Sequence, residues 1–388
     1  MSAGLDERGV AARLHRSLVA QAPRVGSLRA VCGFDGFVDE MITVVGERQG
    51  LGAYRAMGSM NDLGRMLSAA AGRNTLREIV VRSQDPGGCA VNLGDGLAAL
   101  GVGIDFWGTI GAPMHPAFAP FAAICRSANS LGSVYGRTLA FEFGDGKAMF
   151  SAVEQLGELD PECLRAACAD GRFAADCAAA TVIAFTNWSL YPHMTACWRY
   201  VRDTVLSRLT HKPWLFIDLV DPSGRSAADA LAMLESLREF HGATRPVLGL
   251  NLTELGVVST LLGLPAPPAH GEALAAHAER VRARLGLAQV VVHHARATAV
   301  AEGASAVHVA SAPLCQQPRK TTGAGDRFNA GYCLGLMLDL PAAERLALGS
   351  ASGGFFVREA RSASLAELTA FTAAWAQGQL ALAVRAEQ

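Results

Sequence analysis

Asp326 lies directly behind a short run of small residues, and this spacing suits phosphoryl transfer. Gly323, Ala324 and Gly325 precede it and a helical pattern follows, which predicts a tight loop leading into a helix N-terminus. The first turn of a helix has unpaired N–H groups and a partial positive charge, and small residues let an anion reach them. A carboxylate beside that site suits a base that takes the proton from a hydroxyl group attacking phosphorus. A plain helix N-cap is the alternative.

A second glycine-bearing turn precedes another predicted helix. Pro86, Gly87 and Gly88 indicate the turn, and the apolar spacing after them predicts a helix that ends at Gly101. Paired glycines permit close approach of a ligand, and Asn92, one turn into the helix, can donate to and accept from hydroxyl groups. The segment is either a turn with a helix start or part of a site for an alcohol.

Carboxylates and an amide follow several predicted strands. Asp35 and Asp39 lie near the end of the first strand, where open α/β sheets bind ligands, although a turn Asp and an exposed strand Asp are simpler explanations. Asp218 closes a later strand and is a weaker candidate. Asn251 ends another strand, and Glu254 follows three residues later, as in a helix cap with its acidic partner. An amide and a carboxylate also suit Mg²⁺ held largely through water.

The elements that must position these residues alternate along the chain. Buried strands are predicted at residues 181–185 and 215–219, each followed by a helical stretch, which favours parallel βαβ units in an α/β fold. Residues 131–153 alternate around a Gly144–Gly146 turn and predict a β-hairpin. Residues 1–28 predict an amphipathic helix followed by a turn, and no chemistry is assigned to them.

Composition excludes several classes of protein. The 388 residues are 51% hydrophobic and 18% charged with a net charge of −1, so neither nucleic acid nor an anionic membrane is an expected partner. The nine cysteines are scattered without a C-x-x-C pair, and no apolar run approaches the roughly 18 residues of a spanning helix, so a cytoplasmic protein is expected. The chain has no G-x-x-x-x-G-K-[ST] loop, so the small residues before Asp326 are the candidate phosphate site.

The segment T-G-A-G-D-x-F-x-x-G, residues 322–331, resembles the C-terminal signature of the ribokinase-like, or phosphofructokinase-B type, carbohydrate kinases. The resemblance implies one α/β domain over residues 1–388, a three-layer αβα sandwich with a mostly parallel central sheet and a small β-sheet lid. Residues 1–28 would be a helical extension. In this family the aspartate, here Asp326, is the catalytic base, and the amides of residues 323–325 form the anion hole.

Other marks of the family follow in the expected order. The sugar-binding pattern G-G-x-x-x-N falls on Gly87, Gly88 and Asn92. For the sugar-binding aspartate, Asp39 is the better match and Asp35 the second candidate. The G-G-x-x-x-N pattern also favours the sugar and nucleoside branch of the family over its vitamin kinases.

The resemblance also implies a nucleotide site with magnesium. The N-x-x-E pattern of Asn251 and Glu254 would position Mg²⁺ and the transferred phosphate. Ser350 and Gly353, on a small-residue helix, would lie near the adenine, with core packing as the equal alternative. The expected nucleotide-binding residues are Asn251, Thr322, Gly323, Gly325, Ser350 and Gly353.

The lid expected from the resemblance comprises segments around residues 37–60 and 131–153. It would close over the sugar and exclude water, a competing acceptor for the phosphoryl group. In this family the lid often makes the dimer contact, so a homodimer is the protein partner that the resemblance suggests.

Two departures from the family pattern stand out. Ala295 and Thr298 replace glycines that lie beside the nucleotide in family members. Lys320 replaces an aspartate that helps to bind a monovalent cation in many of them. We expect the Lys320 ammonium group to supply that charge, so activity should not depend on potassium; a large activation by potassium would contradict this.

The sequence thus predicts a Mg²⁺-assisted kinase that transfers a phosphoryl group from ATP to a hydroxyl group of a sugar or sugar-like molecule. Two alternatives are a non-catalytic ligand-binding relative of the same fold and a kinase that uses ADP as the donor. Formation of ADP from ATP with a panel of sugars separates the first alternative, and a comparison of donors separates the second.

Overall fold

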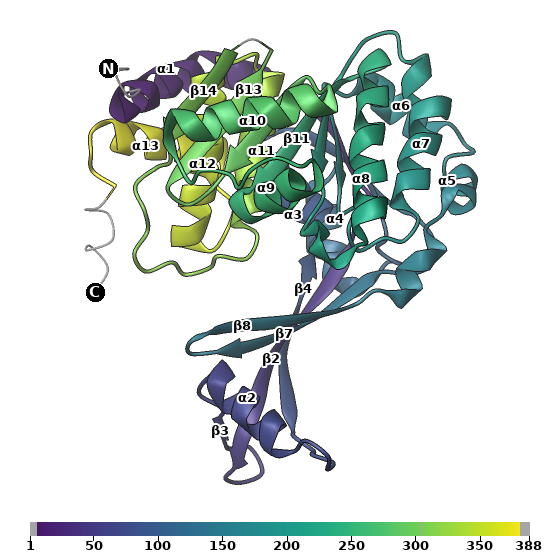
Figure 1. Cartoon of the computed structure of the whole chain (residues 1–388), viewed down its shortest axis with the longest axis vertical. Helices are drawn as coiled ribbons and strands as arrows, with labels where there is room; N and C mark the ends of the chain where they lie inside the picture. Colours follow the sequence, from purple (N-terminus) through teal and green to yellow (C-terminus); the bar gives the residue numbers. More distant parts are fainter. Residues whose placement is uncertain (1–5, 304, 381–388) are drawn as a thin grey trace.

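The structure, a computed structural model, describes residues 6–303 and 305–380 and contains two β-sheets (Figure 1). The larger sheet lies in the body of the molecule, and the smaller one projects from that body together with helix α2. Strands and helices alternate along the body as the sequence predicts, so the α/β fold is confirmed. No helix of the described residues is both long and apolar enough to cross a membrane.

The described residues place nine strands in the large sheet, in the order β14-β13-β12-β11-β10-β9-β1-β5-β6. These are β1 (Arg29–Gly33), β5 (Gly103–Gly108), β6 (Ser127–Ser130), β9 (Val182–Thr186), β10 (Trp214–Asp218), β11 (Arg245–Asn251), β12 (Gln289–His293), β13 (Ala297–Glu302) and β14 (Ser305–Ala310). Neighbours from β12 to β6 pair in parallel, whereas β13 and β14 are antiparallel. The carboxyl ends of the parallel strands therefore meet at one edge of the sheet, where ligands of such folds bind.

Helices cover both faces of this sheet because its strands are apolar on both faces. In β1, for example, Ala30 and Cys32 point into one core and Val31 into the other. One core is covered by α1 (Glu7–Val25), α3 (Cys89–Ala99), α4 (Ala119–Ile124), α11 (Ala324–Met337), α12 (Ala342–Glu359) and α13 (Leu365–Ala376). The other is covered by α5 (Pro161–Ala167), α6 (Arg172–Ala179), α7 (Met194–Thr204), α8 (Ala227–Ser236), α9 (Leu252–Leu261) and α10 (Gly271–Leu285). The predicted three-layer αβα sandwich is thus confirmed.

The small sheet is built around the long strand β2. Its elements are β2 (Phe37–Arg48), β3 (Tyr54–Ala56), β4 (Ile79–Gly87), β7 (Gly136–Phe143) and β8 (Gly146–Ala152), with α2 (Met60–Ala69) beside them. Strands β7 and β8 form the predicted hairpin. Of the predicted turn residues, however, Pro86 and Gly87 end β4, which pairs with β2, and only Gly88 lies between that strand and α3. Pro86 is compatible with that strand because β4 lies at an edge and an edge strand tolerates a missing N–H donor.

The N-terminal helix α1 packs its predicted apolar face, Val10, Leu14 and Leu18, against α12 and α13. It runs through Pro23 to Val25, where the sequence predicts a turn. A proline removes one backbone donor, and in the last turn of a helix this loss is tolerated better than in the middle. The segment thus completes one face of the sandwich.

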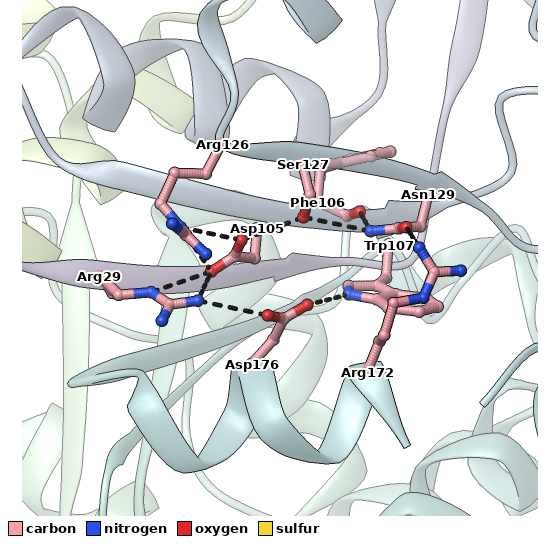
Figure 2. Close-up of polar contacts among 9 residues, drawn as sticks. All are labelled: Arg29, Asp105, Phe106, Trp107, Arg126, Ser127, Asn129, Arg172 and Asp176. Carbon is pink, nitrogen blue, oxygen red and sulfur yellow. Dashed lines mark hydrogen bonds and ion pairs between the residues drawn. The ribbon is translucent and has the colours of Figure 1, made fainter. Parts of the chain in front are cut away.

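A polar network joins β1, β5 and α6 near the amino ends of the strands (Figure 2). Asp105 is only 1% exposed and pairs with Arg29 and, at 3.2 Å, with Arg126. Arg29 also contacts Asp176 at 3.2 Å, and Asp176 accepts a hydrogen bond from the Trp107 indole at 3.0 Å. Each buried charge of this network has a partner, so the network fastens α6 to the sheet.

Candidate active site

The loop before α11 has the predicted form. Gly323 is the N-cap with a left-handed φ of 88°, and α11 begins at Ala324. The left-handed backbone favours glycine here, and a Cβ atom on Gly323 would lie 2.9 Å from Arg327 Nη1, so another residue would also displace that side chain. The loop that the sequence predicts as an anion hole therefore leads into the first turn of α11, which contains Asp326. In this structure the Ala324 N–H donates to the Thr321 carbonyl at 3.1 Å.

Asp326 contacts Asn92, a residue of the segment that the sequence predicts as the alcohol-binding site. Asn92 Nδ2, on α3, donates a hydrogen bond of 2.9 Å to Asp326 Oδ2. Burial, followed by the charge of the nearby Asp218 carboxylate, raises the pKa of Asp326 to about 7, and Arg327 opposes the shift. A carboxylate with a pKa near neutral pH is suited to accept a proton during the reaction.

Asp35 lies in the interior and connects three elements. Its carboxylate accepts hydrogen bonds from the backbone N–H groups of Cys89 and Ala90, both at 2.8 Å. The Thr186 hydroxyl at 2.6 Å and the Asn187 amide at 3.0 Å also donate to it. With four donors and no exposed surface, Asp35 holds the N-terminus of α3 against β1 and β9.

Asp39 is partly exposed and lies against the paired glycines. A Cβ atom on Gly87 would lie 2.3 Å from an Asp39 carboxylate oxygen, and one on Gly88 would lie 2.9 Å from Asp35. The two glycines thus leave space for the carboxylates of Asp39 and Asp35. The sequence alone does not show this reason for glycine at both positions. Burial raises the pKa of Asp39, whereas the nearby Lys320 ammonium lowers it.

Asn251 and Glu254 form a capping box at the start of α9. Asn251 Oδ1 accepts from the Glu254 N–H at 2.9 Å, and Glu254 Oε2 accepts from the Asn251 N–H at 2.8 Å. Burial, followed by the charge of Asp218, raises the pKa of Glu254 to about 8. Its second oxygen makes no hydrogen bond within the described residues, so a divalent cation held through water fits this carboxylate. The described residues contain no group of three or more side chains that would bind a metal ion directly.

Asp218 and Asn329 are more closely tied to the site than the sequence indicates. Asn329 Nδ2 donates to Asp218 Oδ2 at 2.7 Å, while Asn329 Oδ1 is buried without a partner among the described residues. Burial raises the pKa of Asp218 to about 6. The position of Asn329 one helical turn after Asp326 indicates that both lie on one face of the helix. It does not indicate that this face is turned toward β10.

A cavity of about 300 Å³ lies beside the loop. Ser350 and Gly353 line it, and the Ser350 hydroxyl is buried without a partner among the described residues. His293 stacks on Phe328 with 4.9 Å between ring centroids, and burial lowers the pKa of His293 to about 4. The other lining residues are His294, Ala295, Ser311, Ala312, Pro313, Leu314, Cys315, Pro318, Thr321, Ala324, Gly325, Gly349, Gly354, Val357 and Arg358.

The residues that depart from the family pattern lie in different places. Ala295 lines the cavity, whereas Thr298 is buried in β13 opposite His293. The cavity is therefore retained although both positions lack glycine. Lys320 lies 5.8 Å from the centroid of the Phe356 ring.

A family model and a related protein that match this chain are both described as ketohexokinases. The model of a family described as prokaryotic ketohexokinase matches residues 6–375. A ketohexokinase of Haloferax volcanii is 28% identical over 356 residues, which cover 91% of this chain and 92% of the relative.

Solved structures with the same fold include three sugar kinases. A mutant phosphofructokinase-2 of Escherichia coli has a TM-score of 0.60 at 15% identity, with 90% of this chain and 98% of that chain covered. A ribokinase of Thermotoga maritima has a TM-score of 0.60 at 15% identity, covering 89% and 98%. A fructokinase of Xylella fastidiosa with bound ATP has a TM-score of 0.60 at 14% identity, covering 88% and 97%. These likenesses show the fold.

Proposed function

The chain belongs to the prokaryotic ketohexokinase family of carbohydrate kinases, and on that premise we propose that it transfers the γ-phosphoryl group of ATP to a hydroxyl group of a ketohexose. The sugar class is the one that the family and its Haloferax relative are named for. The hydrogen bond between Asn92 and Asp326 carries the proposal. This bond joins α3, the helix after the glycine pair, to the start of α11, the helix after the candidate phosphate loop at residues 323–325. The two residues are 234 positions apart in sequence.

In the proposed reaction, Asp326 takes the proton of the sugar hydroxyl group as its oxygen attacks the γ-phosphorus. The backbone N–H groups of residues 323–325 stabilise the charge on the phosphoryl oxygens, and each such donor is worth about 3 kcal/mol in the transition state. Asp39 and Asn92 bind the sugar. Asp35 has no exposed surface, so we propose that it supports the site rather than contacts the sugar.

Glu254 and Asn251 would hold Mg²⁺ through water, and the ion would neutralise phosphate charge when bound. The raised pKa of Glu254 supports this proposal. Burial and the Asp218 charge disfavour its ionised form, and a nearby cation would stabilise that form. The chain's own residues then keep the carboxylate in place, since its other oxygen is fixed by the capping box.

The cavity beside the loop supports a nucleotide donor. It reaches Ala324 and Gly325 of the loop, and the unpaired Ser350 hydroxyl and the small Gly353 leave room for a flat, polar base. The bound ATP of the Xylella fructokinase favours ATP over ADP. A cavity next to the base carboxylate also argues against a non-catalytic relative that has lost nucleotide affinity.

We further propose that the small sheet, with its segments around 37–60 and 131–153, is a lid over the sugar and the contact surface of a homodimer. Its exposed apolar side chains support a subunit contact, because such a contact would remove apolar surface from water. These residues include Ile79, Val81, Met149 and Phe150.

Replacement of the base tests the proposed chemistry. We expect Asp326→Asn to lower kcat for sugar-dependent ADP formation by about 10²- to 10⁴-fold, since a general base contributes that much, with the sugar Kd nearly unchanged. Asp339→Asn, at an exposed carboxylate just beyond the other end of α11, is the control and should keep the wild-type rate. Retention of most of the rate by Asp326→Asn would contradict the role of Asp326 as the base.

A further inference from the structure

Helices α3 and α11 are joined by two side-chain bridges next to each other. The first is the Asn92–Asp326 hydrogen bond at 2.9 Å. The second is an ion pair in which Arg327 Nη2 donates to Asp95 Oδ2 at 2.6 Å. Asn92 and Asp95 are three residues apart and share one face of α3, while Asp326 and Arg327 are consecutive in α11.

The two helices lie close enough for these short side chains to reach across. Gly96 of α3 faces Ala330 of α11, and a Cβ atom on Gly96 would lie 2.7 Å from the Ala330 Cβ. Any larger residue at position 96 would push the helices apart. The close contact therefore sets the distance at which both bridges form.

Arg327 is held from several sides beneath the phosphate loop. Its Nε donates to Ser362 Oγ at 3.1 Å, and that hydroxyl donates to Asp95 at 2.5 Å. The guanidinium carbon lies 4.5 Å from the centroid of the Phe356 ring. The remaining nitrogen, Nη1, lies next to Gly323 and makes no hydrogen bond within the described residues.

We propose that Arg327 and Asp95 are positioning residues that lock the sugar-side helix α3 to the phosphate-loop helix α11. This inference rests on the proposed function, because it assigns the lock to the same reaction. The lock holds Asp326 at a constant distance from Asn92 and supports Gly323 from below, so the base and the anion hole keep one geometry. A displacement of about 1 Å in such a site can reduce the rate about a hundredfold.

The chain contains a matched ion pair away from the site. Arg345 pairs with Glu302, and the side-chain exposures of 10% and 32% are close to the 10% and 34% of Arg327 and Asp95. Arg345 also lies over an aromatic ring, that of Tyr332. Removing either carboxylate should therefore disturb the fold to a similar extent, and only Asp95 should affect catalysis.

The test compares Asp95→Ala with Glu302→Ala in the full chain. We expect Asp95→Ala to lower kcat about tenfold while both KM values stay within about twofold, and Glu302→Ala to keep the wild-type kcat with a similar fall in thermal midpoint. Arg327→Lys should retain more activity than Arg327→Met, because the lysine can still pair with Asp95. Equal kcat values for Asp95→Ala and Glu302→Ala would overturn the inference.

Amide hydrogen exchange of the peptide covering residues 320–328 tests the positioning role of Arg327 and Asp95 without measuring activity. It therefore distinguishes a failure of this inference from a failure of the proposed function. Wild-type protein that forms no ADP with any sugar refutes the proposed function, and exchange alone then decides the inference. Faster exchange of this peptide in Asp95→Ala than in Glu302→Ala supports the lock. Equal exchange in the two variants overturns it.

Discussion

Three buried carboxyl groups have raised pKa values, because burial, followed by repulsion from neighbouring carboxylates, disfavours their charged forms. The values are about 7 for Asp326, about 8 for Glu254 and about 6 for Asp218. Unfolded carboxyl groups titrate near 4. The folded protein therefore holds more protons than the unfolded chain between about pH 4 and pH 8, and this contribution to the free energy of unfolding falls as pH rises across that range. Such destabilising clusters are typical of functional sites.

The raised pKa of Asp326 predicts the pH dependence of activity. The base must be ionised, so kcat/KM for the sugar should fall as pH drops below about 7. Burial is the main cause of the raised pKa of Asp326, and the Asp218 charge adds to it. Asp218→Asn removes that charge, so the acidic limb should move to lower pH. The pH profile of Asp339→Asn should match that of the wild type. An acidic limb that stays in place in Asp218→Asn would contradict the electrostatic explanation.

At the level of elements, the ends of the strands have two different tasks. Asp218 and Asn251 lie at the carboxyl ends of β10 and β11, on the side where we propose the active site. Near the amino ends, the network around Asp105 fastens α6 and the neighbouring strands β1 and β5 together (Figure 2). The proposed catalytic residues and this stabilising network therefore lie toward opposite ends of the strands.

The Asp105 network predicts a stability effect without a catalytic one. Asp105→Ala leaves Arg29 and Arg126 without their buried partner, so we expect a loss of about 3 kcal/mol in the free energy of unfolding, measured by urea denaturation. The KM for the sugar should not change, because the network lies away from the site. Glu162→Gln, in an exposed pair with Arg165, is the control and should leave the denaturation midpoint where it is. Equal midpoints for the two variants would refute a stabilising role.

At the scale of the whole molecule, the sandwich holds the cavity and the phosphate loop, while the small sheet projects from it on β2, β4, β7 and β8 (Figure 1). Asp39 lies in β2 and Gly87 ends β4, so the strands that carry the proposed lid also carry proposed sugar contacts. Movement of the sheet would therefore move those contacts with it.

The proposed homodimer can be tested on the same sheet. Val81 in β4 is 47% exposed, and Val81→Lys places a charge in the proposed contact. We expect sedimentation velocity to show a dimer for the wild-type protein and a monomer for Val81→Lys, because a desolvated unpaired charge opposes association. Val19→Lys on α1, where the valine is 57% exposed, should remain dimeric. Identical sedimentation of wild type and Val81→Lys would contradict the contact.

The sequence by itself determined the fold class and the local form of the loop at Gly323, because these depend on short-range patterns: alternation, helix spacing and glycine. It also identified the N-x-x-E pattern of Asn251 and Glu254, although it could not decide between a capping box and a metal site. The structure shows the capping box, and the metal role stays a prediction. The assignments of the remaining site residues likewise stay predictions.

Only the tertiary structure decided which distant residues meet. It showed that the glycine pair makes room for Asp35 and Asp39, that Asn92 contacts Asp326, and that Arg327 pairs with Asp95. These contacts join residues that are 48 to 234 positions apart, and the contacts between α3 and α11 depend on how closely those helices pack. Local patterns carry no information on that distance, because it is set by the sum of side-chain volumes between the helices and the sheet.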